Sequence, residues 1–253
     1  MKMKKSLPFR SLVSLLLCAS APAGFAQLTF TDNFERSELG ADWSATGGDW
    51  TIDGDNRLRS ADGNTSNHIV YFNGFELTDS WTMVAHAEIL VFDQNWQGFG
   101  MNVQDVAGTY RSYIDRFRTQ EAFGAPATAG HQFLEGEGAG GDLSFPNTAT
   151  GQPSTELDIE TIYRFEIAWD AEVPDTITLE IRDNGTTLLD VSYGFAGWND
   201  WTGAGFAGFY DMRSMAVHDM ELTVVPEPHT TGAVLAGAAL LVALWVRRRV
   251  ARR

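Results

Sequence analysis

Between residues 27 and 224 the chain consists of short runs in which apolar and polar residues alternate, and Gly, Asp and Asn separate the runs. The run 82–92 places Met83, Ala85, Ala87 and the next two odd-numbered residues on one face. A period of two is that of a β-strand, because successive side chains point to opposite sides of a sheet. The pattern therefore predicts strands and no helix in this region.

Turn sequences connect the expected strands. Asp183-Asn184-Gly185 separates two alternating runs and predicts a tight β-hairpin. Asp53 to Asn56 predicts a second hairpin, in which Gly54 takes a positive φ. About twelve strands without helical crossovers predict an all-β, antiparallel two-sheet sandwich or jelly roll.

The alternation lapses between Phe117 and Leu157, where the chain is rich in Gly, Ala, Thr and Pro. A loop of this length is uncommon inside a compact domain, so the segment is either functional or contains strands that the pattern does not reveal. Residues 131–134 are the candidate strand within it.

The segment 225–253 has three parts. Pro226-Glu227-Pro228 should end strand structure, since proline fixes φ and has no N–H to donate. The uncharged run 230–246 predicts one transmembrane helix, because 17 residues cover roughly 26 Å of a bilayer core of about 30 Å. A basic cluster that contains Arg247, Arg248 and Arg249 follows, and by the positive-inside rule it stays in the cytoplasm.

This order of prolines, helix and arginines resembles the PEP-CTERM sorting signal of Gram-negative bacteria. The resemblance implies a partner, a membrane-embedded cysteine protease of the exosortase type, which removes the helix and releases or transfers the protein to the envelope or an exopolysaccharide matrix. The alternative is an ordinary single-pass anchor with two chance prolines, because hydropathy and charge do not separate the two.

Residues 1–26 have the organisation of a secretory signal peptide. A basic start precedes an apolar run, and Gly24-Phe25-Ala26 offers small residues for cleavage after Ala26. The only cysteine, Cys18, lies in this segment, and Leu17 before it disfavours a lipoprotein. The expected domains are therefore the signal peptide 1–26, the β-sandwich 27–224 and the sorting tail 225–253, and the mature chain has no thiol chemistry.

Removal of the two ends changes the charge. Residues 27–228 contain nine arginines, no lysine and all 33 acids, so their net charge is −24, whereas that of the whole chain is −15. Such a surface repels nucleic acid and anionic lipid, and it favours solubility and bound cations. No nucleic-acid partner is expected.

The domain resembles the concanavalin A-like lectin/glucanase group, including laminin-G-like modules. The resemblance is carried by residues 30–34, 49–58, 166–169, 179–185 and 205–221. It implies a β-sandwich and suggests a structural calcium ion between the first and last strands, with Asp32 and Asp219 as ligands. The alternative is that both carboxylates only cap turns and strand edges.

Catalytic residues are not evident. The Glu-x-Asp-x-x-Glu arrangement of sandwich-fold glucanases is absent, and the alternating acids Glu156, Asp158 and Glu160 precede Tyr163 at what is expected to be a loop edge. Glu88 with His86 is a better candidate, since both share one strand face, but a strand edge or solvent face with polar residues is the favoured interpretation.

Metal chemistry has few other candidates. The loop 53–56 has some features of a calcium loop but lacks the remaining EF-hand ligands, so a plain hairpin turn is favoured. The histidines are too widely separated for a zinc site; those of the domain are His68, His86, His131 and His218.

Tryptophans provide the remaining candidates. Trp198-Asn199-Asp200-Trp201 and Trp96 combine indole rings with amide or carboxylate groups, which suits stacking on sugar rings. Alternatively, these rings cover the ends of the core. The sequence thus predicts an exported envelope or exopolysaccharide-matrix protein with a non-catalytic, carbohydrate-binding β-sandwich. The alternatives are a glycoside hydrolase or lyase on the same fold, and a matrix protein without a ligand.

Overall fold

The structure, a computed structural model, describes ten segments between residues 27 and 225. They are 27–60, 68–74, 76–77, 79–91, 96–118, 128–139, 143–149, 154–173, 176–194 and 205–225. Residues 28–224 form one compact unit. The described segments contain sixteen strands and no helix, so the all-β prediction is confirmed.

The first eight strands lie before residue 118. They are β1 (Leu28–Asp32), β2 (Trp43–Ala45), β3 (Trp50–Ile52), β4 (Leu58–Ser60), β5 (Ile69–Phe72), β6 (Ser80–Ile89), β7 (Gln97–Val106) and β8 (Thr109–Phe117). The second eight are β9 (Thr128–Ala139), β10 (Ser144–Ala149), β11 (Ser154–Glu156), β12 (Ile162–Trp169), β13 (Thr176–Asp183), β14 (Thr186–Gly194), β15 (Phe206–Tyr210) and β16 (Met215–Val225).

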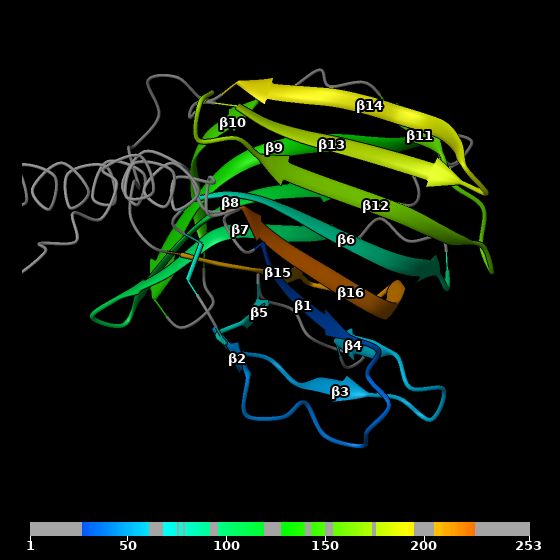
Figure 1. The fold of residues 1–253 in the computed structure, drawn as a ribbon, viewed down its shortest axis with the longest axis horizontal. Coiled ribbons are helices and arrows are strands. Elements are labelled where there is room, and N and C mark those ends of the chain that lie inside the picture. The colour runs from blue at the N-terminus through cyan, green and yellow to red at the C-terminus, as the bar shows by residue number, and fades with distance from the viewer. Residues whose placement is uncertain are drawn as a thin grey trace, which may run out of the picture. The chain divides into compact units, whose positions relative to one another are not determined.

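The strands form two eight-stranded sheets that lie in two layers (Figure 1). The first sheet has the order β14-β13-β12-β6-β16-β4-β3, and β1 also pairs with β16. The second sheet has the order β10-β9-β8-β7-β15-β5-β2, and β11 also pairs with β9. The antiparallel two-sheet sandwich is therefore confirmed, and the first and last strands are neighbours, since Leu28 is opposite Val224.

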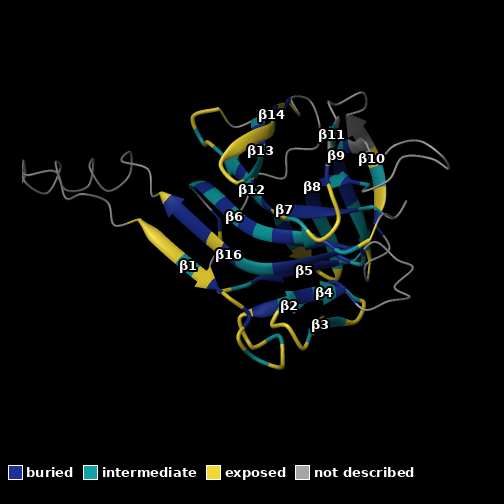
Figure 2. Cartoon of the chain, turned by 90° about the vertical axis from the view of Figure 1, so that its right-hand side faces the viewer, coloured by how far each residue is buried: buried dark blue, intermediate teal, exposed yellow. Residues whose placement is uncertain are grey.

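The core lies between the sheets, because the alternating pattern buries one face of each strand. In β6 the odd-numbered residues from Trp81 to Ile89 are buried and the even-numbered ones are partly exposed. Phe165 of the first sheet packs against Phe99 and Phe117 of the second, with ring centres 5.2 and 5.7 Å apart. Burial of each such side chain contributes up to about 3 kcal/mol to folding. Figure 2 shows the contrast between buried β16 and the mostly exposed β1.

The two predicted hairpins are present. Asn184 and Gly185 both have positive φ, at 44° and 83°, which is the requirement of the type I′ turn between β13 and β14. In the hairpin of β3 and β4, however, the positive φ of 59° is at Asn56 and not at Gly54. Asparagine tolerates the left-handed region better than other residues with side chains, which explains the exchange.

The segment 117–157 is the main difference from the sequence-based expectation. It contains β9, β10 and β11, so strands occupy much of the expected loop, and the candidate strand 131–134 lies inside β9. Glycines hide the alternation there: a Cβ on Gly136 would lie 3.0 Å from the Ile114 Cδ1 atom, so a larger side chain would crowd the packing of β8. These strands are part of the reason why the number is sixteen and not about twelve.

One predicted strand is shorter than expected. β6 ends at Ile89, before the predicted end at residue 92. The Leu90 N–H donates to the Ser214 carbonyl, and the Val91 side chain is exposed. The chain therefore leaves the sheet although its apolar pattern continues.

Several predictions concern parts of the chain outside the described residues. These parts are the signal peptide 1–26, the tryptophan segment 198–201 and the tail from Pro226 onward, including its expected helix 230–246. Among the residues that are described, none belongs to a helix with the length and apolarity needed to cross a bilayer.

Candidate functional site

The second sheet has a face that points away from the main core. Its strand register places Tyr210, Gly98, Arg116 and Gln132 in one row across β15, β7, β8 and β9. Side chains of residues that are opposite each other in neighbouring strands point to the same side of a sheet. The row therefore brings together residues that are far apart in sequence.

An apolar cluster supports this row. Its buried members include Ile69, Ile114 and Leu134, and aromatic residues at the edge pack against them. The partly buried members are Trp96, Tyr110, Phe145 and Phe206. A face that combines buried aliphatic side chains with half-exposed aromatic rings is suited to contact a flat, partly apolar ligand.

Arg116 lies between two aromatic rings. Its guanidinium carbon is 4.4 Å from the Trp96 ring centre and 4.5 Å from that of Phe145. Its Nε and Nη2 donate to the Gln132 Oε1 atom at 3.2 and 2.9 Å, which fixes the orientation of the fork. The cation–π contacts and these hydrogen bonds hold Arg116 in one geometry.

Arg118 lies on the same side of β8, two residues along the chain. Its guanidinium carbon is 4.1 Å from the Trp96 ring centre, and its Nε is buried without a hydrogen-bond partner. Trp96 thus contacts two guanidinium groups. We call Trp96, Arg116, Arg118, Gln132 and Phe145 the arginine–aromatic face.

Burial perturbs the ionisable groups of this row. Burial lowers the pKa of Arg116, while the nearby Tyr210 hydroxyl and its hydrogen bond oppose this change. Burial likewise raises the pKa of Tyr210 to about 12, although the Arg116 charge acts in the opposite direction. Tyr210 is therefore neutral and Arg116 charged at physiological pH, so the face presents positive charge.

Asp32 and Asp219, the predicted calcium ligands, lie on the neighbouring strands β1 and β16. Both line a cavity of about 530 Å³ on the first sheet. The Asp32 carboxylate accepts hydrogen bonds from Arg36 at 2.6 Å, from the Trp43 indole at 2.8 Å and from the Phe34 N–H at 2.9 Å. Both of its oxygens are thus engaged by donors.

These two residues do not fit a calcium ion. The Asp219 Oδ1 lies 2.7 Å from the His86 Nδ1, and an arginine already neutralises Asp32. Calcium requires six to eight oxygen ligands, and a paired guanidinium disfavours a cation at the same carboxylate. Within the described segments, no three His, Cys, Asp or Glu side chains are grouped so that they can hold a metal ion.

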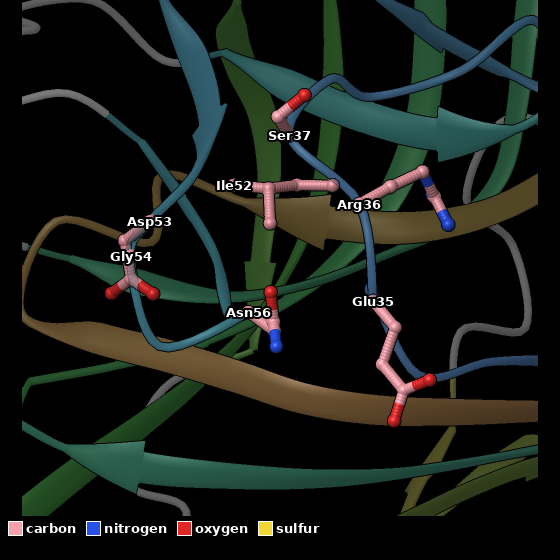
Figure 3. Close-up of a pocket in the computed structure, with 7 residues that line it drawn as sticks. All are labelled: Glu35, Arg36, Ser37, Ile52, Asp53, Gly54 and Asn56. Carbon is pink, nitrogen blue, oxygen red and sulfur yellow. The ribbon is translucent and has the colours of Figure 1, made fainter.

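The loop 53–56 is a closed turn. The Asp53 Oδ1 accepts the N–H groups of Asp55 and Arg57 at 3.0 Å, and its Oδ2 accepts the Arg57 Nε at 3.0 Å. Figure 3 shows the loop beside Glu35 and Arg36 at a pocket of about 610 Å³. Because both Asp53 oxygens accept hydrogen bonds from Asp55 or Arg57 of the same hairpin, the hairpin interpretation fits better than a calcium loop.

The acid and base candidates are held in ion pairs. Glu88 accepts from Arg57 at 2.8 Å, and its Oε2 lies 3.0 Å from the His218 Nε2. His86 contacts Asp219, so the predicted pair of Glu88 and His86 does not act as a unit. Asp158 and Glu160 are exposed between β11 and β12, while Glu156 ends β11. Glu88 and His86 thus belong to polar contacts that link β6 to β16 and to Arg57.

Comparison with known proteins bears on the fold. No family model and no curated protein matches the chain. Among solved structures, peanut lectin in complex with a nonapeptide has a TM-score of 0.52 at 12% identity, covering 78% of this chain and 97% of that one. The VIP36 exoplasmic/lumenal domain in a Ca²⁺/Man2-bound form has a TM-score of 0.51 at 9% identity, covering 81% and 90%.

A third structure agrees with these two. The legume lectin-like domain from Entamoeba histolytica has a TM-score of 0.51 at 8% identity, covering 73% of this chain and 91% of that one. The described domain therefore has the legume-lectin or concanavalin A-like sandwich fold, which confirms that part of the sequence-based resemblance. At such low identity the likeness concerns the fold alone.

Of the predicted sugar-contacting residues, Trp96 lies on the arginine–aromatic face, whereas Trp198 to Trp201 are outside the described residues. The sequence did not reveal Arg116, Arg118 or Phe145 as site residues. The available signal was the pair Arg116 and Arg118, two residues apart in an acidic, lysine-free domain. Phe145 was hidden because its strand fell within the expected loop.

Proposed function

We propose that the domain is a non-catalytic polysaccharide-binding module, and that its arginine–aromatic face contacts the ligand. The observation that carries the proposal is the position of Trp96 and Phe145, two half-buried rings that both contact the Arg116 guanidinium. Aromatic rings stack on the apolar faces of sugars, and the neighbouring guanidinium and amide groups bond to hydroxyls. The lectin-type fold is consistent with this function.

The module acts outside the inner membrane, in the envelope or an exopolysaccharide matrix. The signal-peptide pattern of residues 1–26 and the tail with Pro226-Glu227-Pro228 and Arg247-Arg248-Arg249 support export and sorting. An exosortase-type protease removes the tail, so the membrane helix is a temporary tether. The mature chain then carries the acidic charge of residues 27–228.

A glycan array probed with the purified full-length protein tests the binding function. We expect retention of at least one class of polysaccharide and no release of reducing sugar from it. Release of sugar that Glu88→Gln abolishes would instead establish a hydrolase. Failure to bind any glycan would contradict the proposal.

A further inference from the structure

The arginines of the domain differ in how they are neutralised. Six of the nine arginines in residues 27–228 form ion pairs with Asp or Glu at 4.0 Å or less: Arg36, Arg57, Arg111, Arg164, Arg182 and Arg213. Among the described residues, no such carboxylate partner exists for Arg116 or Arg118. In a domain with 33 acids, two neighbouring arginines without an acid are unexpected.

Both arginines are nonetheless held in place. Trp96 contacts both guanidinium groups, and Gln132 accepts two hydrogen bonds from Arg116. The Arg118 Nε is buried without a partner, which is unfavourable for a charged donor unless a ligand completes its hydrogen bonds. The site is therefore organised for an acceptor that the described protein does not itself supply.

The cross-strand neighbours of Arg116 differ from those of arginines in the first sheet. In the first sheet, Glu166 and Glu180 are partly exposed on the face opposite the core, where each has an arginine partner. Across β8, in contrast, the row that contains Arg116 has glycine and glutamine as its cross-strand neighbours. The two cross-strand neighbours of Arg116 thus carry no charge that could neutralise its guanidinium group.

We infer that the ligand of the arginine–aromatic face is an anionic polysaccharide, whose carboxylate or sulfate groups bind Arg116 and Arg118 while its sugar rings contact Trp96. This inference rests on the proposed function and names the chemical class of its ligand. The planar guanidinium fork matches the two oxygens of a carboxylate or sulfate. Distant acids do not prevent binding, because at physiological salt charges separated by more than about 8 Å are largely screened.

Matched pairs of polymers test the inference. The full-length protein is titrated with polygalacturonate and with its carboxyl-reduced form, and with dextran sulfate and unmodified dextran. We expect at least one charged polymer to bind about tenfold more tightly than its neutral counterpart, since charge-assisted hydrogen bonds are the stronger kind. Preference within the first pair identifies a carboxylate ligand, and preference within the second identifies a sulfate ligand.

Variants link this preference to the site. Arg118→Gln should lower the affinity for the charged polymer about tenfold and leave the affinity for the neutral polymer unchanged. Arg111→Gln is the control, because it removes one charge from the same sheet, at an arginine of β8 that is already paired with Glu137. Arg118→Lys retains the charge but not the planar fork, so its affinity for the charged polymer should lie between those of the wild type and Arg118→Gln.

Three results would overturn the inference. Equal affinity for the charged and neutral polymers would leave the proposed function intact but remove the anionic ligand. An equal loss in Arg111→Gln and Arg118→Gln would show that net charge, and not this site, determines the preference. Absence of binding to all polymers and to the glycan array would contradict the proposed function as well.

Discussion

The guanidinium carbon of Arg116 lies 4.4 Å from the ring centre of Trp96, and the same ring contacts Arg118, two residues further along the chain. One indole thus orients two cations on the outer face of the second sheet. The contact depends on the strand register, which sets Arg116 between Gly98 and Gln132. Glycine at position 98 allows β7 to approach β8 closely, because a Cβ there would lie 2.0 Å from the Asp115 carbonyl oxygen. On the other side, the Gln132 amide fixes the guanidinium group.

The Asp32 carboxylate should make the free energy of unfolding depend on pH in the acidic range. Burial alone would raise the pKa of Asp32, but hydrogen bonds from Arg36, Phe34 and Trp43 outweigh it and hold the pKa below its ordinary value of 3.8. Because the folded-state pKa is lowered, the stabilisation is present above pH 3.8 and is lost as the pH falls through the folded-state value. Asp32→Asn should lower the free energy of unfolding by about 2 kcal/mol at neutral pH.

Urea unfolding of the wild type and Asp32→Asn across pH 2 to 7 measures this effect, roughly the range in which a carboxylate of lowered pKa titrates. The difference between the two proteins should shrink as the pH falls below 3.8. Arg36→Gln, which removes the charged partner, should weaken the dependence. If the free energies of unfolding of the wild type and Asp32→Asn differ by the same amount throughout this range, the Asp32 carboxylate does not cause the pH dependence.

A second prediction concerns the pair Asp115 and His131 inside the core. The His131 Nδ1 lies 3.6 Å from the Asp115 Oδ2, and both side chains are almost completely buried. Burial, together with the nearby Asp115, raises the pKa of Tyr193. Loss of one partner leaves the other polar group buried alone. His131→Leu should therefore lower the free energy of unfolding by about 3 kcal/mol.

The double variant Asp115→Leu/His131→Leu should recover much of this loss, because it removes both buried polar groups. Denaturant unfolding of the four proteins completes the double-mutant cycle. Additive losses in the double variant would show that the two residues do not interact.

Calcium should not act through the carboxylates of the first and last strands. Since Asp32 is engaged by Arg36 and Asp219 by His86, Asp219→Asn should leave the effect of calcium on the melting temperature unchanged. Thermal unfolding in excess calcium and in EDTA measures this. If calcium raises the melting temperature of the wild type and Asp219→Asn abolishes this rise, an ion site at this pair would instead be established.

The sorting proposal predicts a change at the C-terminus. Mass spectrometry of the protein from envelope or matrix material should show a chain that begins after Ala26 and ends near Pro226 to Pro228. An intact Arg253 terminus in the mature protein would leave only the ordinary-anchor interpretation.

Strand periodicity predicted much of the sandwich. The buried alternation of Tyr163, Phe165 and Ile167 and the Asn184-Gly185 turn follow directly from local rules, since burial and turn chemistry act over a few residues. Only residues 131–134 of β9 were predicted as a strand, because glycines at positions 130, 136 and 138 remove alternating side chains from the rest of the pattern. Its place between β8 and β10 depends on pairing with distant segments.

The candidate site was less predictable than the fold. Trp96 was identified from its chemistry, but its partners Arg116 and Phe145 come together only through the order of the strands in the second sheet. In the same way, the sequence placed Asp32 next to the last strand without revealing that Arg36 occupies its carboxylate. Side-chain partners of this kind follow from tertiary packing, which a periodic pattern does not encode.

The most direct test of the central claim is the affinity of Trp96→Ala for the polysaccharide that the wild type binds, measured by isothermal titration calorimetry. Trp50→Ala is the matched control, because Trp50 is also partly buried but belongs to the first sheet. The account predicts a loss of about tenfold or more for Trp96→Ala, as expected when a stacking ring and two cation contacts disappear, and wild-type affinity for Trp50→Ala. Unchanged affinity in a folded Trp96→Ala protein would contradict the account.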